Sequence, residues 1–468
     1  MSGGLVSQDT LARQRAAYLR QPVPSHAERI ADLRTLEHFV RENRQPLIDA
    51  VSADYGHRSP HETVMTEIAP LLAGIKHARK HLRGWMRPQR RQVDRLAYGL
   101  GRNTVLPQPL GVVGVIVPWN FPINLSLVPL ACIFAAGNRA MVKMSENSRH
   151  LAALLIQRMP AYFPPEKLQF FDETGGVGVE FSKLPFDHLL FTGSGTTGRA
   201  VMAAAAQNLC PVTLELGGKA PAIVADDFDL AVAAERILFV KYLNAGQICT
   251  SVDHVYVPQA KVAAFVELAR QIVPKRYPDL ASPDYTSIID RRAYERLKHA
   301  LDDARARGAR VEALLPGPAF DDERHRIAPH IVVDAPADAE LMQREIFGPI
   351  LPVLGYQQLD DVVARINAGP RPLAIYPFSH HRPTLDHLID HVMSGGVTIN
   401  DALVHVGQDD LPFGGVGDSG MGHYHGVEGF NTFSKLRPIF RQSRWSTLKL
   451  LFPPYGRLAD RILAFLTR

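Results

Sequence analysis

Cysteine is scarce in this chain, with three residues among 468. Three cysteines in so long a chain cannot form a disulfide framework, and we therefore expect a reducing compartment. Long apolar runs are lacking too, because proline, asparagine or charge interrupts each one before it could span a bilayer. The N-terminal stretch MSGGLVSQDT also lacks a charged region followed by an apolar one. Together these absences predict a cytoplasmic protein.

A strong charge of one sign is also absent, since the net charge is +5 and basic residues are mostly mixed with acids. The more basic segments are 83–95 and the tail from Lys435 to the end of the chain. Neither segment has the interleaved aromatics or the module signature that nucleic-acid recognition requires. We therefore expect no nucleic-acid partner, and we expect these segments to face solvent or another subunit. The ordinary globular composition, 46% hydrophobic, predicts two or more domains.

The periodicity of apolar residues divides the chain into three regions. Residues 8–86 carry apolar residues at helical spacing, which predicts successive amphipathic helices. From about 109, short β-branched strands alternate with helical segments, and a second such series begins after Gly218, with a helix expected at 229–243 and another at 289–308. This alternation predicts an α/β fold with parallel sheets, whose ligands bind beyond the carboxyl ends of the strands.

A glycine-rich turn follows one of these strands. Gly193, Gly195 and Gly198 fit the pattern G-x-G-x-x-G between a strand and a helix, which predicts a site for the phosphates of a dinucleotide. In that pattern an acid about 20 residues further on holds the ribose, and Glu215 lies about that far along. Glu215 also has two other interpretations. An unpaired buried carboxylate suits a general base, and an ion pair with Lys219 would give it only a structural role.

Three further positions have the character of reactive groups. Cys249 lies in NAGQICTSV, among residues that suit a closely approached backbone rather than a packing layer, so we expect something to reach its sulfur. Asn120 lies in a proline-bounded turn, where its amide could hold an oxyanion or simply satisfy the turn. Glu345 lies between a helix and a strand, in a setting similar to that of Glu215.

The remaining cysteines and the histidine pairs predict no chemistry. Cys132 lies in an apolar helix and Cys210 just before a buried strand, so core positions are expected for both. The pairs His380–His381 and His423–His425 lack accompanying ligands, so we expect surface or loop positions and no metal site.

Seven segments together carry a resemblance to a known family. They are PWNFP, VKMSE, FTGSGTTG, LELGGKAP, NAGQICT, EIFGPIL and PFGGVGDSGMG, and they occur in the order and spacing of the NAD(P)-dependent aldehyde dehydrogenase superfamily, over about 110–430. The short N-terminus and the ending SGMGHYHG resemble the class 3 branch, and within it the chain looks most like bacterial coniferyl aldehyde dehydrogenases. The resemblance implies the family fold, with a Rossmann-like cofactor domain, an α/β catalytic domain and a small oligomerisation segment.

The resemblance assigns roles to individual residues. Cys249 is implied as the nucleophile, Asn120 as an oxyanion donor and Glu215 as the general base, which frees Glu215 from the ribose. The cofactor, NAD or NADP, is expected to contact Lys143, Glu146, Gly193, Ser194, Gly198, Glu345 and Phe347. The positions matching substrate-lining residues are Phe121, Phe239 and Phe413, which suit an aromatic aldehyde such as coniferyl aldehyde, although fatty or benzylic aldehydes would also fit.

The resemblance also implies an organisation of the whole chain. We expect a cofactor domain at 1–90 and 109–217, a catalytic domain at 218–410, an oligomerisation segment at 91–108 and 427–445, and a basic tail at 446–468. A homodimer is expected. The tail places apolar residues among arginines, which favours packing on the partner subunit over association with an anionic membrane surface. Two rivals stay open: an acylating, coenzyme A-linked reductase of the same fold and a non-catalytic, membrane-associated scaffold.

Overall fold

The structure is a computed structural model that describes residues 3–173, 177–444 and 446–467. Its first sheet has six strands in the order β17-β7-β6-β3-β4-β5. The strands are β3 (Val112–Ile116), β4 (Arg139–Lys143), β5 (Leu168–Phe171), β6 (His188–Thr192), β7 (Val212–Glu215) and β17 (Gly420–Met421). All pairs are parallel except that of β17 with β7. The predicted alternation of strands and helices is thus present, with β17 added from far along the chain.

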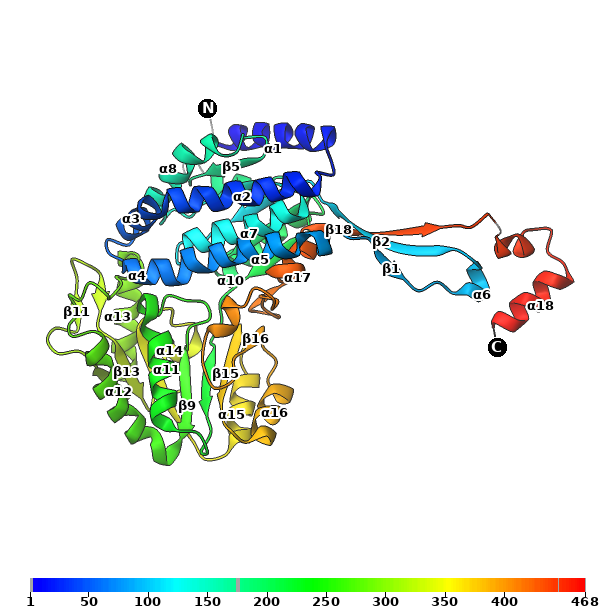
Figure 1. Cartoon of the computed structure of the whole chain (residues 1–468). Helices are drawn as coiled ribbons and strands as arrows, with labels where there is room; N and C mark the ends of the chain where they lie inside the picture. The colour runs from blue at the N-terminus through cyan, green and yellow to red at the C-terminus, as the bar shows by residue number, and fades with distance from the viewer. Residues whose placement is uncertain (1–2, 174–176, 445, 468) are drawn as a thin grey trace.

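Helices cover both faces of this sheet because its strands are apolar on both sides. In β3, Val113 and Val115 belong to one apolar cluster and Val112 and Ile116 to another. Around the first cluster lie α2 (His26–Glu42), α3 (Arg44–Asp54), α5 (Ala69–Trp85), α7 (Pro122–Ala136) and α8 (Arg149–Arg158), seen together in the upper part of Figure 1. The second cluster lies under α1 (Gly3–Arg20), α9 (Val177–Ser182) and α10 (Gly195–Ala206).

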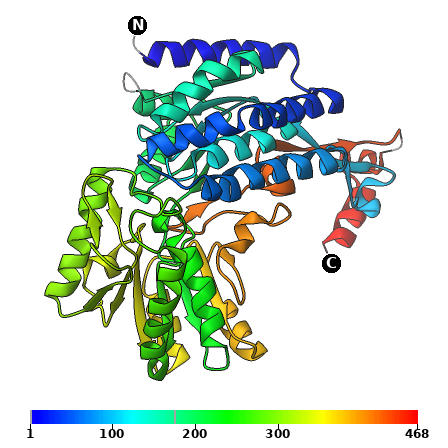
Figure 2. The same ribbon diagram turned by 60° about the vertical axis from the view of Figure 1, so that its left-hand side comes forward.

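The second sheet has seven strands in the order β10-β13-β14-β9-β8-β15-β16. They are β8 (Pro221–Val224), β9 (His254–Pro258), β10 (Arg310–Ala313), β13 (His330–Val333), β14 (Ile350–Tyr356), β15 (Ala374–Phe378) and β16 (Gly396–Val397). One face packs against α11 (Leu230–Tyr242), α12 (Val262–Arg276) and α13 (Arg291–Ala306), and the other against α15 (Leu359–Asn367) and α16 (Arg382–His391). Figure 2 shows this layer below the first.

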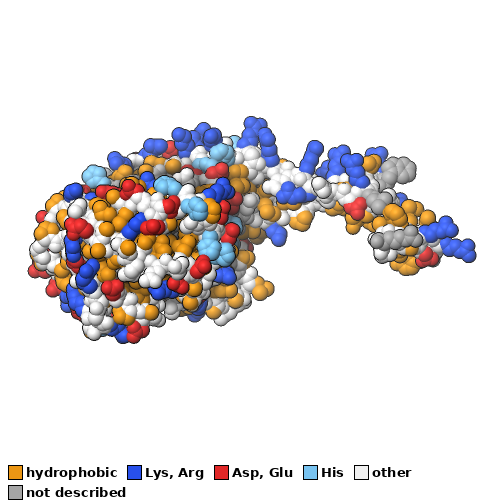
Figure 3. Space-filling model, turned by 90° about the horizontal axis from the view of Figure 1, so that it is seen from below, with side chains coloured by type: hydrophobic (Ala, Val, Ile, Leu, Met, Phe, Trp, Pro, Cys, Tyr) orange, Lys and Arg blue, Asp and Glu red, His pale blue; other side chains and the backbone are white. Residues whose placement is uncertain are grey.

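A narrow arm extends from the body (Figure 1). It is an antiparallel sheet of β1 (Gln89–Arg91), β2 (Arg102–Pro109) and β18 (Ser434–Arg441). At its tip lie α6 (Arg95–Tyr98), a short turn at Thr447–Leu451 and α18 (Arg457–Leu466). In Figure 3 the tip carries hydrophobic and basic side chains next to one another. Residues of α18 that expose their apolar side chains include Leu458, Leu463 and Phe465.

Most predicted elements are present, with two differences. The amphipathic region 8–86 is helical, but it contains α4 (Pro60–Thr63) followed by a π-helical turn at Val64–Ile68. The expected strand around GGVTIN is reduced to the two residues of β16, because the chain then turns through Asn400 at a positive φ of 59°. The smaller elements β11 (Phe320–Asp321), β12 (Arg326–Ile327), α14 (Glu340–Gln343) and α17 (Gly426–Thr432) complete the fold.

Candidate active site

The carboxyl edge of the first sheet carries most of the candidate residues. Glu215 ends β7, Gly193 follows β6, Asn120 follows β3 and Lys143 ends β4. These four strands are neighbours in the order β7-β6-β3-β4 and run in parallel, so their carboxyl ends lie along one edge. The backbone N–H of Gly193 donates to the carbonyl of Glu215 at 3.0 Å, which joins the glycine turn directly to that strand end. Cys249 instead lies in the loop between α11 and β9, in the layer formed by the second sheet.

The loop before Cys249 has an unusual backbone. Asn244, Ala245 and Gly246 follow α11 with φ values of 51°, 49° and 73°, and this left-handed path turns the chain sharply. A Cβ on Gly246 would collide with the carbonyl of Gly348, so glycine is required where the loop meets the segment after Glu345. The Cys249 side chain is half-buried and not in a disulfide. Burial and the nearby carboxyls of Glu345 and Glu215 raise the pKa of Cys249 to about 12, so the thiol needs help to ionise.

Glu215 is a buried carboxyl without a protein partner. Its side chain is 2% exposed, and neither of its oxygens has a hydrogen-bond partner among the described residues. Burial raises the pKa of Glu215 well above its ordinary value, as a general base requires. The alternative of an ion pair with Lys219 is wrong. Lys219 Nζ instead lies 2.5 Å from Asp253 Oδ1.

Glu345 occupies a second buried setting close to Glu215. A Cβ on Gly217, two residues after Glu215, would collide with the Glu345 carboxylate, so this glycine leaves room for it. Burial and the carboxylate of Asp253 raise the pKa of Glu345 to about 8. The chain around Glu345 is held firmly, because Lys219 Nζ donates to the carbonyl of Arg344 at 2.9 Å and Asp253 accepts from the N–H of Ile346 at 2.9 Å.

Phe347 follows Glu345 in a strained conformation. Its φ is 47°, in the left-handed region that a bulky residue rarely adopts. Its ring packs edge-to-face on Trp119, with centroids 5.4 Å apart. Trp119 is the neighbour of Asn120, so this contact joins the Glu345 segment to the PWNFP turn.

Asn120 is fixed at both its side chain and its backbone. Its Nδ2 donates to the carbonyl of Gln247 at 3.2 Å, which places the amide beside the cysteine loop. Its own carbonyl accepts from Tyr55 Oη at 2.9 Å and from Arg58 Nη1 at 3.1 Å. The amide is therefore held next to Cys249 by groups from the N-terminal helices and from the second layer.

These supporting residues were missed by the sequence analysis. Arg58 and Glu67 form a fully buried ion pair of 2.6 Å, and Glu67 Oε2 also accepts from the N–H of Ile123 at 2.7 Å at the start of α7. Glu62 accepts from the N–H of Asn244 at 3.0 Å. Charged residues in an amphipathic helix are normally assigned to its solvent face. The only signal in the sequence was the clustering of Arg58, Glu62 and Glu67 around Pro60.

A cavity of about 670 Å³ opens onto Cys249. All three phenylalanines expected to line the substrate site, Phe121, Phe239 and Phe413, lie in its wall. The Arg58 guanidinium stacks over the Phe121 ring at 4.9 Å, while Phe239 is 43% exposed near the guanidinium of Arg276. The wall is mainly apolar, as expected for a site that binds an apolar small molecule.

The residues expected to bind the cofactor surround the N-terminus of α10 and the end of β4. Ser194 caps α10 by accepting from the N–H of Thr197 at 3.3 Å, and the first turn of this helix can hold a phosphate. Gly198 lets α10 approach the sheet, because a Cβ there would lie 2.7 Å from Leu216. Lys143 forms an ion pair with Glu173, and Glu146 is exposed after β4. These groups are of the kinds that can hold the phosphates and the ribose of a dinucleotide.

The remaining cysteines lie in the core and the paired histidines lie at surface or loop positions, as the sequence analysis expected. Cys132 and Cys210 are both buried at 7% exposure, as expected for core residues. His380, His381 and His423 are exposed, but His425 is half-buried and lines the cavity. Within the described ranges, no cluster of His, Cys, Asp and Glu could hold a metal ion, and no helix is long and apolar enough to cross a membrane.

Comparison with known proteins decides the family. The model of the aldehyde dehydrogenase family matches residues 11–439. The chain belongs to this family. A probable coniferyl aldehyde dehydrogenase of Pseudomonas aeruginosa is 47% identical over 97% of this chain and 94% of its own length. A coniferyl aldehyde dehydrogenase of a Pseudomonas strain is 42% identical over 97% and 95%. The mouse aldehyde dehydrogenase family 3 member B1 is 36% identical over 97% and 96%.

Solved structures show the same fold. The substrate-bound structure of Staphylococcus aureus AldH matches with a TM-score of 0.92 and 32% identity, over 98% of this chain and 99% of that one. The aldehyde dehydrogenase fold expected from the sequence is therefore confirmed. As a member of this family the protein is an oxidoreductase that oxidises aldehydes to acids with NAD(P)⁺.

Proposed function

We propose that this aldehyde dehydrogenase oxidises coniferyl aldehyde and related phenylpropenals to their carboxylic acids. The observation that carries the proposal is the large apolar cavity at Cys249, walled by Phe121, Phe239 and Phe413. Flat aromatic walls suit a conjugated aromatic substrate. Two relatives support the proposal. The relative at 47% identity is a probable coniferyl aldehyde dehydrogenase, and the relative at 42% identity is a coniferyl aldehyde dehydrogenase.

In the proposed mechanism Cys249 is the nucleophile. Its sulfur adds to the aldehyde carbon, and the carbonyl oxygen becomes an alkoxide that the amide of Asn120 and the backbone N–H of Cys249 stabilise. The observed bond from Asn120 Nδ2 to the carbonyl of Gln247 leaves the second amide hydrogen for this task. Because the pKa of Cys249 is raised to about 12, the thiol must lose its proton as substrate and cofactor bind.

When bound, NAD(P)⁺ would supply the acceptor for the hydride that leaves the thiohemiacetal on Cys249 as the thioester forms. The cofactor would be held by residues of this chain. The first turn of α10, at Ser194 and Gly198, would hold the phosphates, and Lys143 and Glu146 would hold the adenosine ribose. Glu345 and Phe347 would position the nicotinamide end, and the glycine at 246 lets the cysteine loop pack closely on the carbonyl of Gly348, in the segment that follows them.

Glu215 completes the reaction as the general base. It takes a proton from a water molecule, which then attacks the thioester carbon and releases the carboxylic acid and the Cys249 thiol. The absence of a hydrogen-bond partner on either Glu215 oxygen within the described residues leaves the carboxyl available to a water. A base that directs water also argues against an acylating, coenzyme A-linked reductase, in which the acyl group passes to a thiol instead.

The experiment that tests the proposed substrate is a panel of aldehydes with both cofactors. Initial rates are measured with coniferyl aldehyde, benzaldehyde and a long-chain aliphatic aldehyde. We expect the highest kcat/KM for coniferyl aldehyde. A preference for the aliphatic aldehyde would overturn the substrate proposal, a requirement for coenzyme A would favour the acylating rival, and no turnover of any aldehyde would favour the scaffold.

We further propose an organisation for the assembled enzyme. The parts 1–90 and 109–217 form the cofactor domain, 218–410 the catalytic domain, and 91–108 with 427–445 the oligomerisation segment of a cytoplasmic homodimer. The basic tail 446–468 packs on the partner subunit, a role supported by the exposed apolar side chains of α18. Truncation after Tyr455 should then weaken the dimer in sedimentation experiments, whereas flotation of only the full chain with anionic vesicles would favour a membrane role.

A further inference from the structure

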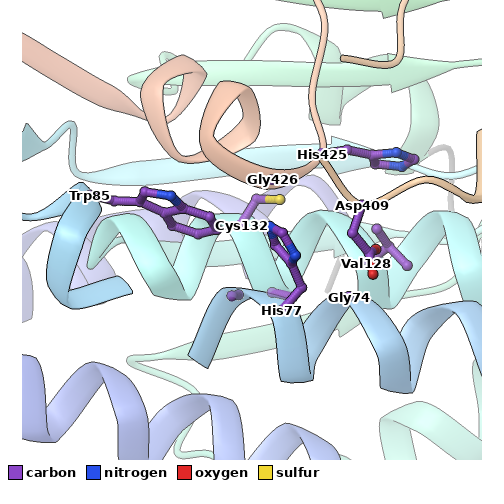
Figure 4. Close-up of a pocket in the computed structure, with 10 residues that line it drawn as sticks. Gly74, His77, Trp85, Val128, Cys132, Asp409, His425 and Gly426 are labelled. Atoms are coloured by element: carbon purple, nitrogen blue, oxygen red, sulfur yellow. The ribbon is translucent and has the colours of Figure 1, made fainter. Parts of the chain in front are cut away.

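One end of the substrate cavity carries a carboxylate that the mechanism does not use. Asp409, His425 and Val128 line the large cavity, and they also line a second, smaller cavity of about 20 Å³, which Figure 4 shows. Asp409 and His425 are here called the polar corner. Among the described residues, no ion pair or side-chain hydrogen bond is made by the Asp409 carboxylate, although burial raises its pKa. An ionised carboxylate can only accept hydrogen bonds, so Asp409 lacks a donor.

The other charged residues of the cavity wall differ from Asp409. Arg276 pairs with Glu235, and Arg236 lies 4.0 Å from Asp401, so the charges there are compensated within the protein. The neighbour of Asp409, Asp410, is exposed and lies 3.7 Å from His77. The His77 imidazole of α5 lines the small cavity with Asp409 and acts to lower the pKa of its carboxyl, but burial lowers the pKa of His77 itself, which favours the neutral imidazole. Among the charged residues of the large cavity's wall that the structure describes, Asp409 alone has no ion pair.

The polar corner and the catalytic turn lie at different positions along one cavity-lining face of α7. The face of α7 that lines the cavity carries Asn124, Leu125 and Val128, and Phe121 comes just before the helix. Phe121 is next to Asn120 at the catalytic end, while Val128 borders the polar corner. Seven residues of helix separate these two positions by about 10 Å. This is the order of length of a phenylpropenal from its carbonyl carbon to its para oxygen.

The surroundings of Asp409 favour an aromatic ring bearing a hydroxyl group. The His425 ring stacks on Phe413, with centroids 5.4 Å apart and planes inclined by 20°, so the two form a flat wall. Burial lowers the pKa of His425 to about 4, which leaves it neutral and unable to compensate Asp409. On the other side, Gly74 of α5 gives the carboxylate room, since a Cβ there would lie 3.2 Å from Asp409 Oδ1.

We propose that Asp409 accepts a hydrogen bond from the para hydroxyl group of the substrate ring and thereby selects phenolic aldehydes. This inference rests on the proposed function and names the residue that recognises the distal end of its substrate. A phenol supplies the donor that the carboxylate lacks, and the bond is strengthened by the charge. A fatty aldehyde would instead cover the carboxylate with methylene groups and leave it desolvated without a donor, which is unfavourable.

The test compares coniferyl aldehyde with 3,4-dimethoxycinnamaldehyde, in which a methyl group replaces the para hydroxyl hydrogen. For Asp409→Ala we expect KM for coniferyl aldehyde to rise about 10- to 100-fold, the usual effect of losing a hydrogen bond to a charged group. KM for the dimethoxy compound should stay within a few-fold of wild type or fall, because this substrate has no donor to lose. Asp409→Asn should lie between, since its amide oxygen still accepts a hydrogen bond.

The matched control is Asp410→Asn, which removes a neighbouring carboxylate outside the cavity wall and should leave both substrates unchanged. Equal effects of Asp409→Ala on the two substrates, or no effect on either, would overturn the inference. Failure of the proposed function looks different. If the wild-type enzyme does not prefer coniferyl aldehyde to long-chain aldehydes, both the function and the inference are overturned. If the wild-type enzyme does prefer coniferyl aldehyde, but Asp409→Ala leaves the ratio of KM for coniferyl aldehyde to KM for the dimethoxy compound unchanged, only the inference about Asp409 is overturned.

Discussion

The backbone carbonyl of Asn120 accepts a hydrogen bond from Nη1 of the buried Arg58 at 3.1 Å. Arg58 in turn forms a fully buried ion pair with Glu67, whose other oxygen accepts from the N–H of Ile123 at the start of α7. The proposed oxyanion donor is thus positioned by charges that never touch the substrate. Such an arrangement keeps the amide in place before the aldehyde arrives, which is how a preorganised oxyanion site lowers a barrier.

Replacing Arg58 with methionine should therefore destabilise the protein and disturb the site. Removing one partner of a buried pair leaves Glu67 uncompensated, and the expected loss of unfolding free energy is about 3–5 kcal/mol. Denaturant unfolding followed by circular dichroism measures it. The control is Arg41→Met, because Arg41 pairs with Glu37 on the surface at 61% exposure and should contribute no more than about 1 kcal/mol. Similar losses in the two variants would contradict the supporting role of Arg58.

Cys249→Ala should abolish aldehyde oxidation while NAD⁺ still binds. The variant removes only the sulfur that would form the thiohemiacetal, and the cofactor contacts come from other residues. Steady-state rates and cofactor titration by fluorescence measure the two properties separately. Cys132→Ala and Cys210→Ala serve as controls, since both side chains are buried and should affect stability far more than turnover. Residual turnover in Cys249→Ala comparable to that of wild type would exclude Cys249 as the nucleophile.

The enzyme should use both cofactors and prefer NAD⁺. Glu146 is exposed near the proposed ribose site and Glu173 pairs with Lys143, so two carboxylates there oppose the added charge of a 2′-phosphate. Comparison of kcat/KM for NAD⁺ and NADP⁺ measures the preference. Glu146→Gln should shift it several-fold toward NADP⁺, whereas Glu180→Gln, in the exposed pair with Lys183, should not. Strict dependence on NADP⁺ would show the interpretation of this ribose site to be wrong.

Much of the fold could be predicted from the sequence because its signals are local. Strands such as β3 and β8 are short β-branched or apolar runs, and α13 has strong helical periodicity between Asp290 and the glycine at 308. The strand β15 was not predicted, because AIYPF contains a proline and lies among loop residues. The pairing of β17 with β7 joins residues about 200 positions apart, and no local pattern can indicate such a pairing.

The site was predictable only in part, for a similar reason. Cys249, Glu215 and Asn120 stand out in motifs whose composition differs from that of an ordinary core. Tyr55 and Arg58, in the turn between α3 and α4, and Glu67 do not, because no local pattern distinguishes a polar side chain that faces solvent from one that reaches a loop 62 or 65 residues away. The role of Asp409 likewise depends on the cavity, which forms only when α5, α7 and the loop before β17 come together.

The pH dependence of turnover should follow the buried carboxyl of Glu215. Only the deprotonated form can take a proton from water, and burial raises its pKa well above the ordinary value. The rate of thioester hydrolysis should therefore rise with pH over a range that lies above the one in which an ordinary glutamate titrates. The ionised fraction of Cys249, whose pKa is also raised, likewise increases as the pH rises. In Glu215→Gln the rate of thioester hydrolysis should no longer rise with pH.

The most direct test of the mechanism is the pre-steady-state formation of NADH by Glu215→Gln with coniferyl aldehyde. We predict normal NAD⁺ binding, a burst of about one NADH per active site and then a stall, with the steady-state rate lowered about 10²–10⁴-fold, the usual contribution of a general base. Mass spectrometry of the stalled enzyme should place the acyl group on Cys249. A normal steady-state rate with weakened NAD⁺ binding would contradict the account, because Glu215 would then hold the ribose rather than activate water.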